Sequence, residues 1–219
     1  MGTGAHTGVQ NDVLGCSHYR ASLLFIETVI NPACGMVAVR CGTYAEFRSG
    51  QCFSCETSDC QTMGLNLRNK SEAQRGNYYL LTGSSAPYCV QTFRIELTFS
   101  SVAKTTERGY LKVQLQYESG EEGGWEPLNP EALDFRAGEK IFLVFAGAWN
   151  LGGLEKVKAV KLTWTFDYSW RRPFDWLRSH ELHIELTIQL EELSNRNPAQ
   201  FRTADGKLDE KDTAVFARV

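Results

Sequence analysis

The sequence predicts a mainly β protein whose C-terminal part, residues 85–219, is an antiparallel β-sandwich. After Gly83, apolar and polar residues alternate with period two in several short runs. Turn residues such as Gly, Pro and Asn separate these runs, and no long helical pattern interrupts them. Residues 1–84 instead combine one amphipathic helix with closely spaced cysteines, which predicts a unit of a different kind.

Each expected strand rests on its own alternating or continuous apolar run. Together they number roughly six to eight, as in a sandwich domain. Trp164 falls on the apolar side of its run, so we expect it in the core. The clearest runs are residues 90–99, 111–116, 141–145, 160–166, 183–190 and a short last strand near 213–217.

The N-terminal part is predicted to contain a helix over residues 19–30. Apolar residues recur mostly on one side of it, and Asn31 and Pro32 end it. Residues 32–64 are expected to form an irregular, cysteine-rich loop. One helix and such a loop bury too little apolar surface to fold as a domain alone. The apolar positions of the helix are Leu23, Phe25, Ile26, Val29 and Ile30.

Composition excludes some classes of function. A formal net charge of −3 argues against a nucleic-acid partner, because such domains usually carry a basic excess. No window approaches the length of apolar chain that spans a bilayer. Residues 1–8 show neither the basic nor the apolar region of a signal peptide.

Seven cysteines, five of them between Cys34 and Cys60, indicate disulfides and an oxidising compartment. The alternative is a zinc site, since Cys52 and Cys55 form a C-x-x-C pair. A second ligand pair at suitable spacing is missing, so we predict disulfides and no metal. A secreted pattern without a signal peptide suggests that the chain is a fragment of a longer product.

Two motifs in the N-terminal part form a specific combination. A Cys-x-His-x-Arg stretch precedes the helix, and spaced cysteines follow it. This combination resembles the end of the α/β-hydrolase domain in the pancreatic lipase/lipoprotein lipase family. In that family, a sandwich called the PLAT domain follows. The matching stretches are Cys16-Ser17-His18-Tyr19-Arg20, Leu24-Phe25-Ile26-Glu27, Arg40-Cys41, Phe47-x-x-Gly50-x-Cys52-x-x-Cys55, Cys60, and Tyr78-Tyr79-Leu80-x-Thr82.

The resemblance implies that His18, in a turn before the helix, is the general base of a Ser-Asp-His triad. No G-x-S-x-G pentapeptide occurs in the sequence, so the nucleophile is absent and the chain should be inactive alone. No cofactor is implied. The implied domains are a hydrolase remnant over residues 1–84 and a PLAT-like sandwich over 85–219.

The resemblance also implies two disulfides, Cys41–Cys52 and Cys55–Cys60. The mates of Cys16, Cys34 and Cys89 stay open, with a Cys34–Cys89 pair as one alternative.

A third stretch, residues 169–176, is similar to the tryptophan-bearing loop of lipoprotein-lipase-type members. Trp170, Phe174 and Trp176 flank two arginines, a composition that suits a lipid–water interface. The alternative is a loop folded onto its own sandwich. Asn69 begins an Asn-Lys-Ser sequon for N-glycosylation, which suits a secreted surface linker.

Two further groups of polar residues resemble metal sites at first sight. His180 and His183 have a strand spacing that puts them on opposite faces, so we expect solvated strand residues. Acidic residues recur over 205–212, where hard oxygen ligands for calcium are an alternative without EF-hand spacing. A charged turn before the last strand is the preferred interpretation.

We therefore expect the C-terminal portion of a secreted, extracellular lipase acting on triacylglycerol or phospholipid at a lipid–water interface. A colipase-like protein or a second copy of the chain are candidate partners. The first alternative is a non-catalytic PLAT module that binds lipid or protein, although an unpaired Cys16 argues against it. A full-length but inactive lipase relative is the second.

Overall fold

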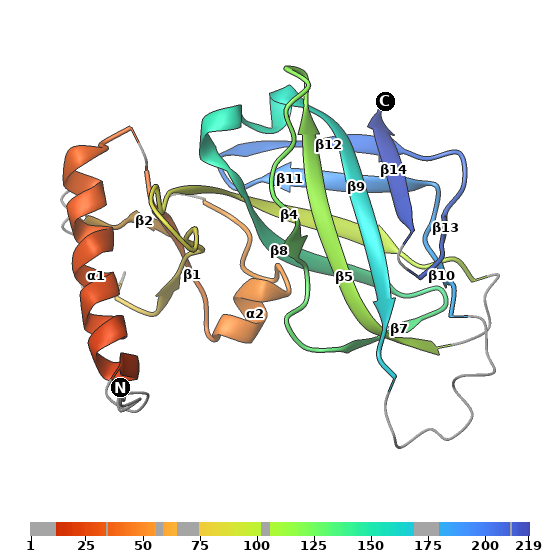
Figure 1. Ribbon diagram of the computed structural model, residues 1–219, viewed down its shortest axis with the longest axis horizontal. Coiled ribbons are helices and arrows are strands. Elements are labelled where there is room, and N and C mark those ends of the chain that lie inside the picture. Colours follow the sequence, from red (N-terminus) through yellow and green to blue (C-terminus); the bar gives the residue numbers. More distant parts are fainter. Residues whose placement is uncertain are drawn as a thin grey trace, which may run out of the picture.

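A computed structural model describes residues 12–33, 35–55, 59–64, 75–101, 106–168, 180–210 and 212–219. Figure 1 shows two parts side by side: a helix with a small sheet, and a larger two-layered β-structure. The predicted fold class, mainly β with a large antiparallel sheet in the C-terminal part, is confirmed. Among the described residues, no helix combines the length and the apolar character needed to cross a bilayer.

The N-terminal part holds two helices and three short strands. They are α1 (Asp12–Ile30), β1 (Val37–Arg40), α2 (Tyr44–Arg48), β2 (Cys60–Thr62) and β3 (Tyr78–Tyr79). The C-terminal part is built almost wholly of strands. They are β4 (Val90–Thr98), β5 (Thr106–Tyr117), β6 (Glu126–Pro127), β7 (Leu133–Arg136), β8 (Lys140–Ala148), β9 (Val157–Phe166), β10 (Leu182–His183), β11 (Thr187–Glu192), β12 (Asn195–Arg202), β13 (Lys207–Leu208) and β14 (Thr213–Arg218), with 3-10 turns η3 (Trp149–Leu151) and η4 (Leu154–Lys156).

The main sheet runs in the order β6-β5-β9-β14-β12-β11-β4-β8, with β7 also paired to β5. The pairing of β12 with β14 is short, and there the sheet turns from one layer to the other. Figure 1 accordingly shows β5 and β9 in front of β4, β8 and β11. One end of this path consists of β6 and β5, and the other end is β8. The two ends face each other across an open seam of the sandwich.

The inward-facing apolar side chains of the strands fill the space between the two layers. Trp164 is fully buried, as predicted, and its ring meets Phe135 edge-on with centroids 5.4 Å apart. Its Nε1 donates to the carbonyl of His180 at 3.0 Å, so the buried indole keeps its hydrogen bond. Phe93 and Phe145 stack across β4 and β8 at 5.6 Å.

The cysteine-rich segment is more ordered than we expected from the sequence. The expectation of an irregular loop over 32–64 is wrong, because β1 pairs with both β2 and β3 in a small antiparallel sheet. Val39, Phe47 and Phe53 form its buried cluster, completed by Val144 and Leu193 of the sandwich. Cross-strand pairing with residues far along the chain gives this segment a regularity that local pattern does not show.

Candidate functional site

Helix α1 is fastened to the rest of the molecule through Arg20. The guanidinium donates from Nη1 to the Ser84 carbonyl at 3.0 Å and from Nη2 to Thr82 Oγ1 at 3.1 Å. A further hydrogen bond joins Nη2 to the Gly83 carbonyl. The same group lies 4.0 Å from the ring centroid of Tyr88, a cation–π contact. The arginine of the Cys-x-His-x-Arg motif is therefore a structural clamp.

A second contact holds the same side of α1. Glu27 is buried, and its Oε2 accepts a hydrogen bond from the backbone N–H of Tyr88 at 3.1 Å. Leu24 packs with Met36 and Cys89. Because Arg20, Leu24 and Glu27 are three or four residues apart, they share one face of the helix. That face is the one packed against this chain.

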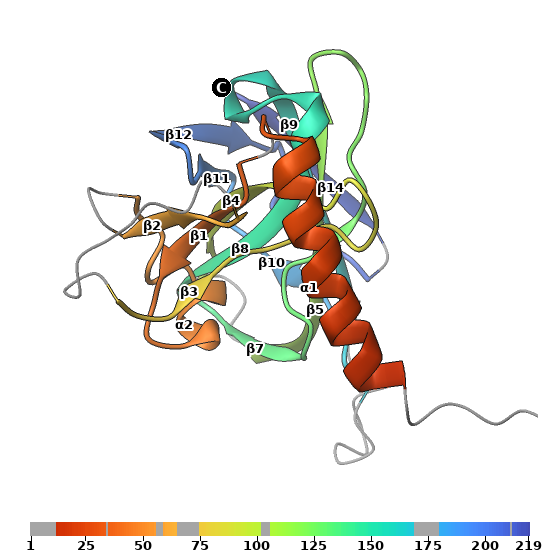
Figure 2. The same cartoon turned by 90° about the vertical axis from the view of Figure 1, so that its left-hand side faces the viewer.

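His18 lies on the opposite face. A residue two positions before Arg20 projects to the other side of a helix, and His18 is exposed. Phe25 follows His18 by seven residues and Val29 by eleven, so all three lie along one stripe. Phe25 is 47% exposed and Val29 46%, with Ile26 and Ile30 also exposed beside them. Figures 1 and 2 both show α1 at the outside of the molecule.

One detail of the sequence prediction for this region is corrected. The helix begins at Asp12, so His18 lies within it and not in a turn ahead of it. Between Asp12 and Tyr19 no proline interrupts the chain, so the helix extends upstream although Gly15 and several other residues there have low helix propensity. The sequence did not indicate which side of the helix is packed, and in the structure Phe25, Ile26, Val29 and Ile30 are exposed.

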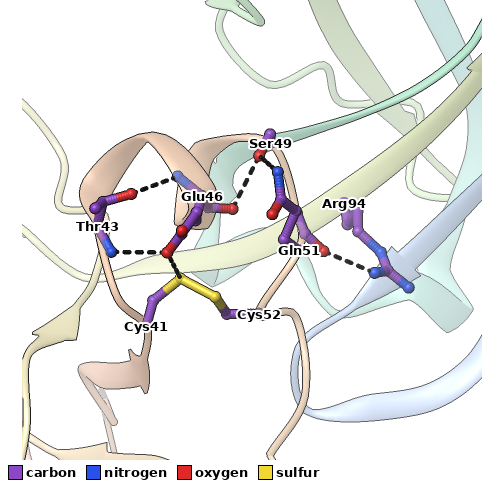
Figure 3. Close-up of a disulfide and its surroundings, with 8 residues drawn as sticks. Cys41, Thr43, Glu46, Ser49, Gln51, Cys52 and Arg94 are labelled. Carbon is purple, nitrogen blue, oxygen red and sulfur yellow. Dashed lines mark hydrogen bonds between the residues drawn. A yellow bond between two sulfur atoms is a disulfide. The ribbon is translucent and has the colours of Figure 1, made fainter.

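Two disulfides brace the small sheet, joining the same cysteines that the resemblance implies. Cys41 pairs with Cys52 and Cys55 with Cys60. Figure 3 shows the first of them beside α2, whose start is fixed by a capping box. The Thr43 hydroxyl accepts from the Glu46 N–H at 3.2 Å, and Glu46 Oε2 accepts from the Thr43 N–H at 2.9 Å.

The disulfide also bears on the question of a metal. Among the described residues, one group has metal-ligand geometry, formed by Cys41, Glu46 and Cys52. Its two sulfurs are joined to each other, so neither is a thiolate able to bind zinc. Cys89 is disulfide-bonded as well, while the side chain of Cys16 and all of Cys34 lie outside the described residues.

Arg94 ties the small sheet to the sandwich, a role that the sequence did not reveal. Its Nη1 donates to the Gly50 carbonyl at 2.9 Å, as drawn in Figure 3, and Nη2 bonds the Glu191 carboxylate. The guanidinium lies 5.1 Å from the ring centroids of both Phe53 and Phe142. The alternation of apolar and polar residues placed Arg94 on the outer side of β4. The neighbouring sequence did not indicate which residues would cover it.

The residues expected at the lipid interface and the glycosylation site are not described. Trp170, Phe174 and Trp176 fall in 169–179, and Asn69 falls in 65–74, both outside the described residues. The flanks of the first segment are well defined. Tyr168 is exposed, and its hydroxyl donates to Glu210 at 2.7 Å. On the other side, His180 begins the described chain again.

The expectation that His180 is a solvated strand residue is wrong. Its side chain is 5% exposed and stacks on Phe166, with ring centroids 3.5 Å apart. Nδ1 lies 3.6 Å from Glu107 Oε2, and that carboxylate is equally buried. The pairing brings together residues 73 positions apart, which spacing within one strand cannot indicate. His183 keeps a half-exposed position, with Nε2 3.6 Å from Glu181.

Comparison with known proteins gives matches to lipases and lipase-related proteins. A family model described as "Lipase" matches residues 3–88. Pancreatic lipase-related protein 2 of Bos taurus is 30% identical over 120 residues, covering 53% of this chain and 25% of that protein. Inactive pancreatic lipase-related protein 1 of Mus musculus is 28% identical over 150 residues, covering 67% and 30%. Lipoprotein lipase of Homo sapiens is 33% identical over 100 residues, covering 45% and 21%.

Solved structures overlap with this one only loosely. The match to alpha-toxin of Clostridium perfringens covers 60% of this chain and 32% of the toxin chain, with TM-score 0.43 and 11% identity. The match to a calcium-dependent 11R-lipoxygenase covers 58% of this chain and 17% of the lipoxygenase chain, with TM-score 0.40 and 13% identity. Overlaps of this size do not identify a fold.

The sequence relatives are more informative, since the names of all of those given above include the word lipase. This chain spans less than a third of the length of the relatives named above. Over residues 3–88, the chain matches the family model described as "Lipase", and it is similar to the lipase relatives named above.

Proposed function

We propose that this chain is the C-terminal portion of a secreted lipase and that His18 is the general base of its catalytic triad. One observation carries the proposal: His18 shares an exposed stripe of α1 with Phe25 and Val29. A contiguous apolar face on a soluble protein usually marks a contact with other protein or with membrane. The rest of a hydrolase domain would cover this face and bring a serine and an aspartate to His18.

In such a protein, His18 would take the proton of the serine during attack on the ester and return it to the leaving alcohol. Arg20 would act as a positioning residue, because it fixes the helix that presents His18. The chain itself has no G-x-S-x-G elbow and so no nucleophile in a known arrangement. Triacylglycerol and phospholipid both remain candidate substrates.

We assign the sandwich a role at the lipid–water interface, as a PLAT-like domain of residues 85–219. Trp170, Phe174 and Trp176 are proposed as its anchors, and a colipase-like protein or a second copy as further partners. The disulfides favour an extracellular location. The proposed division at residues 84 and 85 is supported by the start of β4 at Val90 and by the separate core of the sandwich.

The proposal is tested in the native secretion with an antibody against the sandwich and a fluorophosphonate probe, which labels activated serines. We expect an antibody-reactive band well above the 24.6 kDa of this chain, labelled by the probe. In that protein, His18→Gln should abolish labelling and ester hydrolysis, whereas His183→Gln should change neither. An antibody-reactive band of 24.6 kDa alone, unlabelled, would contradict the proposal.

A non-catalytic binding module is the second candidate, and one observation favours it. The sandwich has its own continuous core and does not need the N-terminal part to complete it. The similarity to a relative named as inactive fits this candidate too. Vesicle flotation of the 219-residue chain tests lipid binding directly. Binding with a native mass of 24.6 kDa would favour the module over the enzyme.

A further inference from the structure

The open seam of the sandwich contains a slot of about 540 Å³ that the proposed catalysis does not use. Strand β5 lines one side and β8 the other, and the segment 82–87 lies across it. Its volume is in the range of small-molecule sites. Because β5 and β8 belong to different layers, the slot leads in between the two sheets.

The inner part of the slot is apolar. Val113 and Leu115 of β5 and Phe145 of β8 line it, and all three are buried core residues. Glycines leave room on the other side. At Gly123, an added Cβ would meet the Tyr117 ring only at 3.9 Å and the Leu115 carbonyl at 3.7 Å, which are ordinary contacts. An unbranched apolar chain suits such a narrow space.

The end of the slot is polar, and its buried groups are hydrogen-bond donors. Tyr117, the last residue of β5, is fully buried, and the backbone of Ala148 interacts with its phenol oxygen. Among the described residues, no acceptor takes the hydrogen of this hydroxyl. The same holds for Nε1 of Trp149, which follows the last residue of β8. Burial raises the pKa of Tyr117 to about 12, so the phenol is a neutral donor at physiological pH. A buried donor without a partner is costly, and a ligand acceptor would relieve that cost.

We propose that this slot binds one acyl chain, whose tail lies between β5 and β8 and whose carbonyl oxygen accepts a hydrogen bond from Tyr117. A free fatty acid and an acyl ester share this chemistry. The Arg20 guanidinium at the slot favours the carboxylate of a free acid, whereas the nearby Glu126 carboxylate opposes it. The site is independent of the triad role of His18.

Isothermal titration calorimetry on the 219-residue chain tests this, with decanoate and 1-decanoylglycerol below their micellar concentrations. We expect saturable one-to-one binding of at least one ligand, and the comparison of the two identifies acid or ester. Gly123→Leu should abolish binding because its side chain fills the slot, and Gly123 has no positive φ to strain. Tyr117→Phe should weaken binding about tenfold.

The exposed Tyr110, on the outer side of β5, provides the matched control, and Tyr110→Phe should bind like the wild type. Thermal unfolding followed by circular dichroism checks that each variant is folded. Two results overturn the proposal. One is that neither ligand binds. The other is that both Gly123→Leu and Tyr117→Phe bind with unchanged affinity, which places the ligand elsewhere on the surface.

Discussion

The two parts of this molecule are stabilised in different ways. The sandwich buries one continuous apolar cluster between its layers, with Trp164, Tyr117 and several phenylalanines fully buried. The N-terminal part has a small cluster that includes Val144 and Leu193 of the sandwich, and it relies on disulfides and on arginine clamps. The sandwich therefore completes its own apolar core, whereas the N-terminal part depends on residues of the sandwich to complete its cluster.

The largest effect is expected from breaking the sandwich core. Trp164→Ala removes a fully buried indole and its hydrogen bond to His180, so it should lower the free energy of unfolding by about 3–5 kcal/mol. Urea denaturation followed by circular dichroism measures this. Trp125→Ala, at a 40% exposed position, is the control and should cost under about 1 kcal/mol. Equal effects of the two would contradict a core centred on Trp164.

The next effect concerns the disulfides and should stay within the N-terminal part. Cys41→Ala with Cys52→Ala opens a link of sequence separation 11, and should destabilise the small sheet by about 3 kcal/mol. Hydrogen exchange should rise in β1 and α2 while the sandwich amides stay protected. The double variant at Cys55 and Cys60, with separation 5, should do less, about 2 kcal/mol. Loss of protection throughout the sandwich would show that the parts unfold together.

Removing the clamp on α1 should have a smaller and still more local effect. Arg20→Ala deletes the hydrogen bonds to the segment 82–84 and should cost about 1–3 kcal/mol. Hydrogen exchange of the α1 amides is the measurement. Lys158→Ala, at an exposed position on β9, serves as control. Unchanged exchange in α1 would mean that Leu24 and Glu27 hold the helix without Arg20.

Alkaline pH should destabilise the sandwich through Tyr117. Burial raises the pKa of the folded Tyr117 to about 12, above its ordinary value of 10, so the folded state binds more protons between these values. Stability is therefore lost as pH rises above about 10, by about 1.4 kcal/mol at pH 11. Tyr117→Phe should remove that loss relative to wild type, measured by urea denaturation at pH 8 and pH 11. An identical pH dependence in both proteins would contradict the burial of the phenol.

The smallest effect is expected on the exposed face of α1. Phe25→Gln with Val29→Gln should change the stability of this chain by less than about 0.5 kcal/mol, because both residues are half-exposed. Leu24→Gln, on the packed face, should destabilise it clearly. In a full-length lipase, the double variant should instead lower the yield of folded enzyme. A large loss in this chain alone would show that the face is already covered.

Sequence reasoning succeeded where local periodicity and side-chain burial coincide. Each alternating run after Gly83 contains a strand, and Trp164 is buried as its place in the alternation indicates. The same reasoning failed at His180, because Glu107 of β5 lies beside its buried ring. It also failed over residues 32–64, because the strands that pair with β1 lie far along the chain. Of the candidate site, the motif led to His18 and Arg20, but the clamp made by Arg20 was not foreseen.

The alternating and apolar runs of the sequence predicted the strands that lie within them, and the spacing of apolar residues predicted the helix over residues 19–30. The cysteine and histidine motifs indicated the similarity of residues 3–88 to lipases, but no pattern predicted β12. Tertiary packing alone selects the side of α1 that is buried, since an amphipathic pattern defines an apolar face but not what covers it. It also decided that Tyr117 and Gly123 line one slot with Phe145, residues that meet because the sheet folds into two layers. Contacts between segments far apart in the chain depend on how the layers pack, and the spacing of residues within one segment does not predict them.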